Sequence, residues 1–140
     1  MASTIKLDVV SAEKSIFSGH VQAVVATGLM GEIGVEPGHA PLLTLLKPGE
    51  VRMTTENGEQ EVIYVSGGML EIQPHVVTVL ADDAERAESL DEAAALQAKE
   101  KAEQALLNRG AEFNYTLAAA ELARAAAQIA AIRKARKQLK

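Results

Sequence analysis

Two hydrophobic periods divide the chain near residue 83. Residues 4–81 contain short segments in which apolar and polar side chains alternate, such as Ile5-Lys6-Leu7-Asp8-Val9. Similar segments, some alternating only in part, occupy residues 21–25, 51–55, 61–65, 69–72 and 76–80. A period of two places every second side chain on the same face of a strand. The first part of the chain is therefore predicted to consist of short β-strands.

Turn residues separate these segments. Asn57-Gly58 lies between two of them, and because both residues accept positive φ at low cost, a hairpin is expected there. Pro37-Gly38 has the composition of a type II turn, in which proline fixes φ and glycine accepts a positive φ. Many short strands with closely spaced turns predict an antiparallel sandwich or barrel.

Beyond Asp83 the composition changes, with one glycine, no proline and abundant alanine. Ser89-Leu90-Asp91-Glu92 matches a capping box, in which the serine caps a backbone N–H and the glutamate reaches back. A first helix is therefore predicted from about Leu90 to Leu107, ended by Asn108-Arg109-Gly110.

Asn114 can cap a second helix, from about Tyr115 to Gln138. A short connection between two long helices predicts an antiparallel hairpin. The predicted fold class is α+β: an N-terminal antiparallel β-sandwich over residues 1–84, followed by a C-terminal antiparallel helical hairpin over residues 88–140.

The predicted helices carry few large apolar side chains. Most are in this list: Leu96, Leu106, Leu107, Tyr115, Leu117, Leu122, Ile129 and Ile132. Alanine favours the helix but buries little area, and burial stabilises by about 25 cal/mol per Å². The helices are expected to be robust singly and docked only loosely. Both a mobile, two-state hairpin and a permanently docked one fit this composition.

Composition and charge narrow the functional classes. The chain has no cysteine, a net charge of -5 and a pI near 5.2, which argue against a thiolate metal site and against general nucleic-acid binding. No signal peptide is evident, and the apolar runs are far shorter than the roughly 20 residues of a membrane span. The last eight residues, 133–140, carry five positive charges, which suggests an acidic partner or a solvated helix end.

Candidate chemistry is sparse. His20, His39 and His75 are scattered and lack the spacing of metal ligands, so no metal site is predicted. Glu32 and His39 are the one acid/base pair that deserves a catalytic hypothesis. They lie in "GEIGVEPGHAPLL", whose density of turn residues fits a catalytic loop or, at least equally well, a stiff contact surface.

A series of motifs runs in order along essentially the whole chain: Leu7 to Glu13, Phe17-Ser18-Gly19, Gly31-Glu32-Ile33-Gly34, Pro37 to Thr44 (PGHAPLLT), Lys47-Pro48-Gly49, Ser66-Gly67-Gly68, Val77 to Asp82 and Leu90-Asp91-Glu92. Together these motifs resemble the epsilon subunit of bacterial F-type ATP synthases. The combination of PGHAPLLT and SGG at this spacing is highly specific.

The resemblance implies a non-catalytic rotor subunit in the central stalk, without a cofactor, bound to the gamma subunit and the c-subunit ring. It implies coupling of proton flow to ATP synthesis, at the cytoplasmic face of the bacterial inner membrane, as a peripheral subunit without membrane insertion. It also implies that a loop from Glu32 to His39 faces the c ring, with Glu32, Gly34, Pro37, Gly38 and His39 as the contact residues.

The same resemblance implies that the hairpin is regulatory. Folded on the sandwich it permits rotation; extended into the alpha/beta catalytic head it blocks ATP hydrolysis. An acidic segment of the beta subunit is the expected partner, with these cations as its counterparts: Arg124, Arg133, Lys134, Arg136 and Lys137. A membrane-surface role for this basic helix is a further alternative, although its apolar face is thin.

Some relatives bind ATP through a motif that resembles Ile/Leu-Asp-x-x-Arg-Ala at the start of the first helix. This chain keeps Leu90 and Asp91 but has Ala94 in place of the arginine. A lost charge-assisted hydrogen bond is worth roughly 1.5–3 kcal/mol. ATP binding is therefore expected to be weak or absent.

Overall fold

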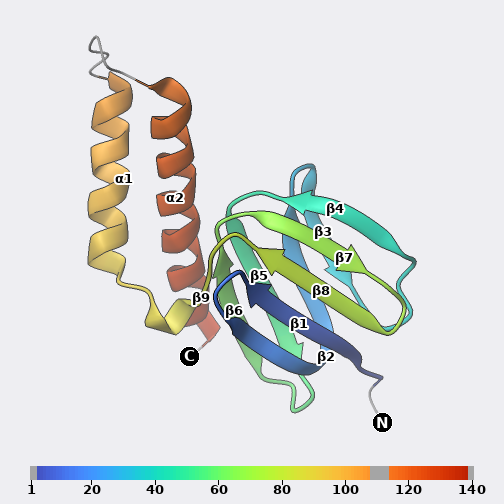
Figure 1. The fold of residues 1–140 in the computed structure, drawn as a ribbon. Helices are drawn as coiled ribbons and strands as arrows, with labels where there is room; N and C mark the ends of the chain where they lie inside the picture. The colour runs from blue at the N-terminus through green and yellow to red at the C-terminus, as the bar shows by residue number, and fades with distance from the viewer. Residues whose placement is uncertain (1–2, 108–113, 139–140) are drawn as a thin grey trace.

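The computed structural model describes residues 3–107 and 114–138, which form a β-sandwich and a pair of long helices (Figure 1). One layer of the sandwich has the strand order β1-β8-β7-β4, and the other contains β3, β2, β5, β6 and β9. The helices stand beside the sandwich, and α2 lies between α1 and the sheet. The predicted order of a sandwich followed by a helical hairpin is confirmed.

The strands have these bounds: β1 Ile5–Ser11, β2 Ser15–Gly28, β3 Gly31–Val35, β4 Leu42–Leu46, β5 Gly49–Thr55, β6 Gln60–Val65, β7 Gly68–Ile72, β8 Val76–Ala81 and β9 Ala84–Arg86. The alternation of apolar and polar residues located β1, β5, β6, β7 and β8. It located only part of β2, and it gave no separate signal for β3, β4 or the short β9.

Strand β2 joins the two layers. Its first half, Ser15 to Val21, pairs with β1, and its second half pairs with β5 and β3. All adjacent pairs but one are antiparallel, as predicted; the exception is β1 with β8, which run parallel from Lys6↔Val76 to Ser11↔Ala81. The pairings β1–β2, β2–β4, β4–β7 and β7–β8 are all antiparallel, and these four reversals of direction make β8 run parallel to β1.

The core lies between the layers and is built from the alternating apolar positions. Leu7 and Val9 of β1, Val79 of β8 and Ile63 of β6 are fully buried in one cluster. Their spacing of two along each strand directs these side chains inward. The same periodicity that predicted the strands therefore also identified their buried face.

The turn predictions hold in part. Gly38 has φ +86°, and the N–H of His39 donates to the carbonyl of Glu36 at 3.1 Å, as a type II turn requires. In the β5–β6 hairpin, Gly58 has φ +81° but Asn57 does not have a positive φ. Only one of the two hairpin residues therefore uses the conformation predicted for both.

The helices are α1, Glu92–Leu107, and α2, Tyr115–Gln138. The predicted cap of α2 is confirmed, because Asn114 Oδ1 accepts the N–H of Leu117 at 3.1 Å. The predicted capping box of α1 is wrong. Asp91 Oδ1 accepts the N–H of Ala94 at 3.2 Å, while Ser89 ends a 3₁₀ turn, Ala87–Ser89. The predicted stop at residues 108–110 lies outside the described residues.

Alanine supplies most of the helix packing. On α1 the buried residues are Ala95 and Ala102, seven residues apart, which share one face. On α2 the buried residues fall into two groups: Ala118, Ala125, Ile129 and Ile132, and Ala127 with Ala131. The second group packs against Val62 and Tyr64 of β6. Helix α2 thus has one face for α1 and a narrower one for the sandwich.

The apolar contact between the hairpin and the sandwich is small. It joins Val62, Tyr64 and Ala87 to Ala127 and Ala131, with Leu90 and Ala135 at its edge. All of the helical residues in this contact are alanines, so little apolar area is buried there. The expectation of loose docking therefore agrees with the observed interface.

Gly68 gives a test of the fold. Its φ is +139°, and a Cβ there would lie 2.1 Å from the carbonyl oxygen of Leu80 on the paired strand β8. We expect Gly68→Ala to lower the free energy of unfolding by about 2 kcal/mol or more, measured by urea denaturation. Gly34→Ala is the control, because a Cβ at Gly34 meets nothing within 4 Å. Equal stability of the two variants would contradict the assignment.

Candidate interaction site

The five residues predicted to face the c ring lie on one continuous segment, but less of it is loop than predicted. Glu32 and Gly34 belong to strand β3, and both are exposed. Pro37 and Gly38 form the turn that follows, and His39 comes directly after it. The prediction of a loop from Glu32 to His39 is therefore wrong for its first half, because residues 31–35 pair with β2.

The turn is tied to the rest of the sandwich. The N–H of Gly38 donates to the carbonyl of Pro74, in the β7–β8 connection, at 3.0 Å. Beside it is an open cleft of about 410 Å³ between residues 23–25 of β2 and residues 34–39. The segment is therefore a braced edge of the sandwich.

Glu32 and His39 do not form an acid/base pair. The carboxylate of Glu32 accepts two hydrogen bonds from the guanidinium of Arg52, at 2.9 and 3.1 Å. His39 Nδ1 lies 2.6 Å from the carbonyl oxygen of Ala40. The two side chains have different partners, and the catalytic alternative loses the geometry it needs.

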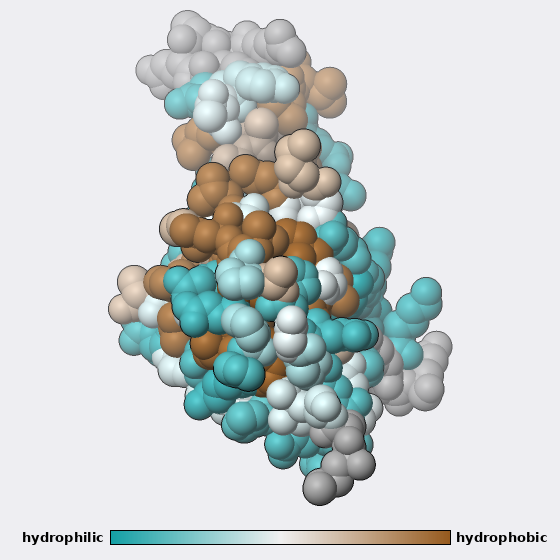
Figure 2. Space-filling model, turned by 90° about the vertical axis from the view of Figure 1, so that its right-hand side faces the viewer, coloured by the Kyte–Doolittle hydropathy of each residue, from teal (hydrophilic) through white to brown (hydrophobic). Residues whose placement is uncertain are grey.

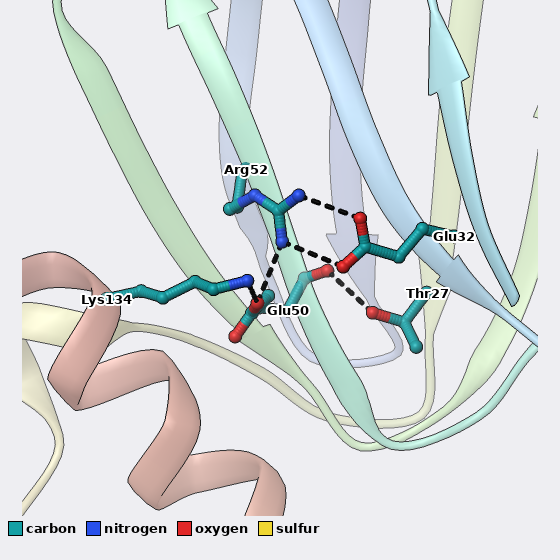
Figure 3. Close-up of polar contacts among 5 residues, drawn as sticks. All are labelled: Thr27, Glu32, Glu50, Arg52 and Lys134. Carbon is teal, nitrogen blue, oxygen red and sulfur yellow. Dashed lines mark hydrogen bonds and ion pairs between the residues drawn. The ribbon is translucent and has the colours of Figure 1, made fainter.

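Arg52 lies at the centre of an ion-pair network that sequence reasoning did not find (Figure 3). Besides Glu32, its guanidinium contacts Glu50 Oε1 at 2.9 Å. The same Glu50 oxygen pairs with Lys134 Nζ of α2. Thr27 donates to the backbone carbonyl of Glu50 at 3.2 Å. A chain of charges, Glu32–Arg52–Glu50–Lys134, thus runs from β3 to the hairpin.

Glu50 is the charged side chain that this network buries. Its residue is 8% exposed, and among the described residues it is the one buried polar or charged residue. An ionised carboxylate loses solvation when it is buried, so it requires opposite charge or hydrogen bonds. Two cations, one from the sandwich and one from the hairpin, meet that requirement.

The network shifts the pKa values of Glu32 and Arg52. The hydrogen bonds from Arg52 lower the pKa of Glu32, and the positive charges of Arg52 and Lys134 act in the same direction. The pKa of Arg52 is raised, first by its hydrogen bonds to Glu32 and further by Glu50. The influence of Lys134 on Glu32 shows that the hairpin contributes to the electrostatics of β3.

The five cations predicted to contact the beta subunit have different surroundings. Lys134 pairs with Glu50, and Arg136 pairs with Glu92 at the start of α1. Arg133 and Lys137 are exposed and four residues apart, so they share a face of α2. Arg124 lines a polar cavity of about 350 Å³ between α2 and the sandwich. Tyr64 lines the same cavity, and its burial raises the pKa of its hydroxyl group.

The two residues expected to belong to a weak or lost nucleotide site have structural roles. Leu90 packs at the edge of the apolar contact between hairpin and sandwich. Asp91 caps α1 through its side chain.

An apolar surface covers part of the sheet β4-β7-β8. Leu45, Met69 and Leu80 are cross-strand neighbours, with exposed fractions of 51%, 40% and 56%. Leu43, two residues before Leu45, extends the same face. Figure 2 shows hydrophobic surface gathered on the upper part of the sandwich. We call Leu43, Leu45, Met69 and Leu80 the apolar sheet face.

Sequence reasoning missed this face although a signal was present. Leu42-Leu43-Thr44-Leu45-Leu46 has four leucines in five positions, and a strand with one buried face can cover only every second side chain. An exposed apolar surface of this kind marks an interaction site. The apolar sheet face is therefore a candidate surface for contact with another protein.

The comparisons with known proteins identify the family. The family "ATP synthase, Delta/Epsilon chain, beta-sandwich domain" matches residues 4–87, and "ATP synthase, Delta/Epsilon chain, long alpha-helix domain" matches residues 88–133. The chain is 65% identical over 140 residues to an ATP synthase epsilon chain of Legionella pneumophila (strain Corby), with both chains covered completely. It is 56% identical to one of Nitrosococcus oceani, with 99% of each chain covered.

Solved structures show the same fold. One chain in the mitochondrial ATP synthase of Euglena gracilis matches with a TM-score of 0.74 and 20% identity, covering 98% of this chain and 82% of that one. The family models and the curated relatives show that the chain belongs to the epsilon chain family of ATP synthases, as the motifs predicted. It is a non-catalytic subunit of that enzyme.

The Glu32–Arg52 pair can be tested by titration. Glu32 has a lowered pKa, so its contribution to stability is present above the unfolded-state value of about 4.3 and is lost as the pH falls through the folded-state value. We expect Arg52→Met to raise the Glu32 pKa, measured by NMR of the side-chain carboxyl. Arg86→Met, which removes the partner of Glu61, is the control and should leave it unchanged. A lowered Glu32 pKa that persisted in Arg52→Met would contradict the pairing.

Proposed function

We propose that the protein is a central-stalk rotor subunit of a proton-translocating F-type ATP synthase. In this proposal it couples rotation of the c ring to ATP synthesis through the gamma subunit, and its hairpin restrains ATP hydrolysis. The observation that carries the proposal is full-length membership of the epsilon chain family, combined with a hairpin that contacts the sandwich over little apolar area. We take the sandwich (1–84) and the hairpin (88–140) as the two working units.

The apolar sheet face is proposed as the surface for the gamma subunit. It presents leucine and methionine side chains from three adjacent strands on a sheet that is hydrogen-bonded on both sides of β7. A rigid apolar face of this kind fits a long-lived contact, because its burial stabilises a complex without ordering a flexible segment.

The segment from Glu32 to His39 is proposed as the joint with the c ring. Two supports favour it over a catalytic role: β3 is hydrogen-bonded to β2, and the Pro37-Gly38 turn is held to Pro74. Proline also restricts φ in the turn. A joint that transmits rotation needs such stiffness.

The hairpin is proposed as the regulatory element, with the acidic segment of the beta subunit as its partner in the extended state. Arg133 and Lys137 are exposed in the docked position, whereas Lys134 and Arg136 are paired within the chain. Departure of the hairpin from the sandwich would release Lys134 for a new acidic partner, and separation of α2 from α1 would release Arg136. ATP binding to the hairpin stays a prediction of weak or absent affinity, because Leu90 and Asp91 have structural roles and Ala94 stands in place of an arginine.

The proposed location is the cytoplasmic face of the bacterial inner membrane, reached through the rest of the complex. In the part of the chain that the structure describes, no helix is both long and apolar enough to span a membrane.

The regulatory role can be tested by truncation after Ala87. A complex reassembled with residues 1–87 is expected to hydrolyse ATP faster than one with the full chain, because the inhibitory helices are gone. A full-length variant with Arg133→Glu and Lys137→Glu is expected to raise hydrolysis part of the way, since its hairpin is kept. Unchanged hydrolysis by a complex that has incorporated the truncated chain would refute the inhibitory role.

The gamma contact can be tested at the centre of the apolar sheet face. We expect Met69→Glu to weaken binding to the purified gamma subunit by about tenfold or more, since a buried unpaired charge costs over 1.4 kcal/mol. Isothermal titration calorimetry measures this affinity. Leu117→Glu, at a similarly exposed leucine of α2, is the matched control and should bind normally. If Met69→Glu bound gamma as tightly as the control, another face would have to be sought.

A further inference from the structure

In the ion-pair network, the guanidinium of Arg52 lies between two carboxylates that belong to different surfaces of the sandwich. Arg52 donates to Glu32, on the segment proposed to meet the c ring, and to Glu50, on the surface that receives the hairpin. Figure 3 shows Arg52 and Glu50 between the other two members of the network, Glu32 on one side and Lys134 on the other. Glu32 and Glu50 therefore share the same guanidinium.

We propose that Arg52 couples two events: the docking of the hairpin on the sandwich, and the choice of Glu32 between Arg52 and a group on a partner protein. This inference rests on the proposed function, in which Glu32 meets a rotor partner and the hairpin leaves the sandwich. When the hairpin is docked, Glu50 has two cations and Arg52 can hold Glu32 with two hydrogen bonds. When Lys134 leaves, Glu50 keeps Arg52 alone, and Arg52 is drawn towards it.

The direction of the coupling follows from the charge on Glu50. Lys134 neutralises part of this charge in the docked state, so its loss strengthens the attraction between Glu50 and Arg52 and loosens Arg52 from Glu32. Glu32 then becomes available to a cationic or hydrogen-bond-donating group on a partner. Binding couplings are reciprocal, so such a group on Glu32 releases Arg52 to Glu50 and favours departure of the hairpin.

The geometry of Arg52 explains why the coupling depends on Glu32 and not on every surface carboxylate. Arg52 is largely buried, with 20% of its side chain exposed, and its planar group fits two carboxylates at fixed angles. Lysine at this position could not hold both in the same way. Glu36, in the turn that follows β3, carries the same charge as Glu32 but lies outside the network.

The experiment measures docking in the isolated full-length chain. The chain lacks cysteine, so Asn57→Cys and Gln104→Cys, at exposed positions of the β5–β6 turn and α1, accept a fluorescent donor and acceptor. Energy transfer recorded along a urea titration gives the docking equilibrium, because urea drives release of the hairpin to completion. The backbone amide NMR signals of the sandwich strands, recorded at the same urea concentrations, follow the sandwich.

The test is a double-mutant cycle of Glu32→Gln and Lys134→Met. We expect Glu32→Gln to lower the docking constant by about two- to fivefold, the range of exposed ion-pair couplings. In the Lys134→Met background the same substitution should have no further effect on docking. The cycle cancels what each substitution does to the sandwich alone. Glu36→Gln, which makes the same change in net charge, should leave docking unchanged.

Arg52→Lys identifies the route of the coupling. If the shared guanidinium carries it, Glu32→Gln should lose its effect on docking in the Arg52→Lys background. The proposal is overturned if Glu32→Gln behaves like Glu36→Gln, if its effect is equal with and without Lys134, or if it survives Arg52→Lys. These outcomes are independent of the truncation assay. Faster hydrolysis without residues 88–140, together with a zero coupling, would remove the inference and leave the proposed function standing.

Discussion

Burial of the Glu50 carboxylate determines how the hairpin docks on the sandwich. The charge lies at the surface of β5 that α2 covers. Because α2 excludes water from this surface, cations must stabilise the carboxylate in place of its hydration. One cation, Arg52, comes from its own strand, and the other, Lys134, comes from the hairpin. The docked arrangement is therefore specified by charge as well as by the apolar contact beside it.

That apolar contact is small enough for charge to matter. A hairpin whose contact with the sandwich was made by leucines would stay docked. The ion pairs of Glu50 would then add little to the free energy of docking. Here Ala127 and Ala131 meet Val62 and Tyr64, so the apolar term is modest and a few charged contacts carry a comparable weight. Such a balance allows the position of the hairpin to respond to partners.

Much of the fold could be predicted because its signals are local. Alternation in β1 and β8, and the side chain of Asn114 at the start of α2, act within a few residues of the structure they determine. The start of α1 was misplaced because Ser89 and Asp91 are both good caps, and tertiary packing of Ala87 and Leu90 decided between them. Strand β3 was missed because its Gly-Glu-Ile-Gly-Val sequence reads as a turn until β2 is known to lie beside it.

The interaction site was less accessible to sequence reasoning. The position and stiffness of the Pro37-Gly38 turn were predicted, whereas the partner of Glu32 was not, because Arg52 is twenty residues away and is brought close only by the pairing of β3, β2 and β5. The apolar sheet face could have been found from the four leucines of β4, whose number exceeds what one buried face accommodates.

The continuous course of β2 has a mechanical consequence. Because its fourteen residues pair first with β1 and then with β5 and β3, the two layers share one covalent backbone. Two separate sheets stacked face to face can slide along their plane of contact, whereas layers threaded by a common strand resist that shear through bonds and bond angles. A load on one layer therefore reaches the other through the covalent backbone as well as through side-chain packing.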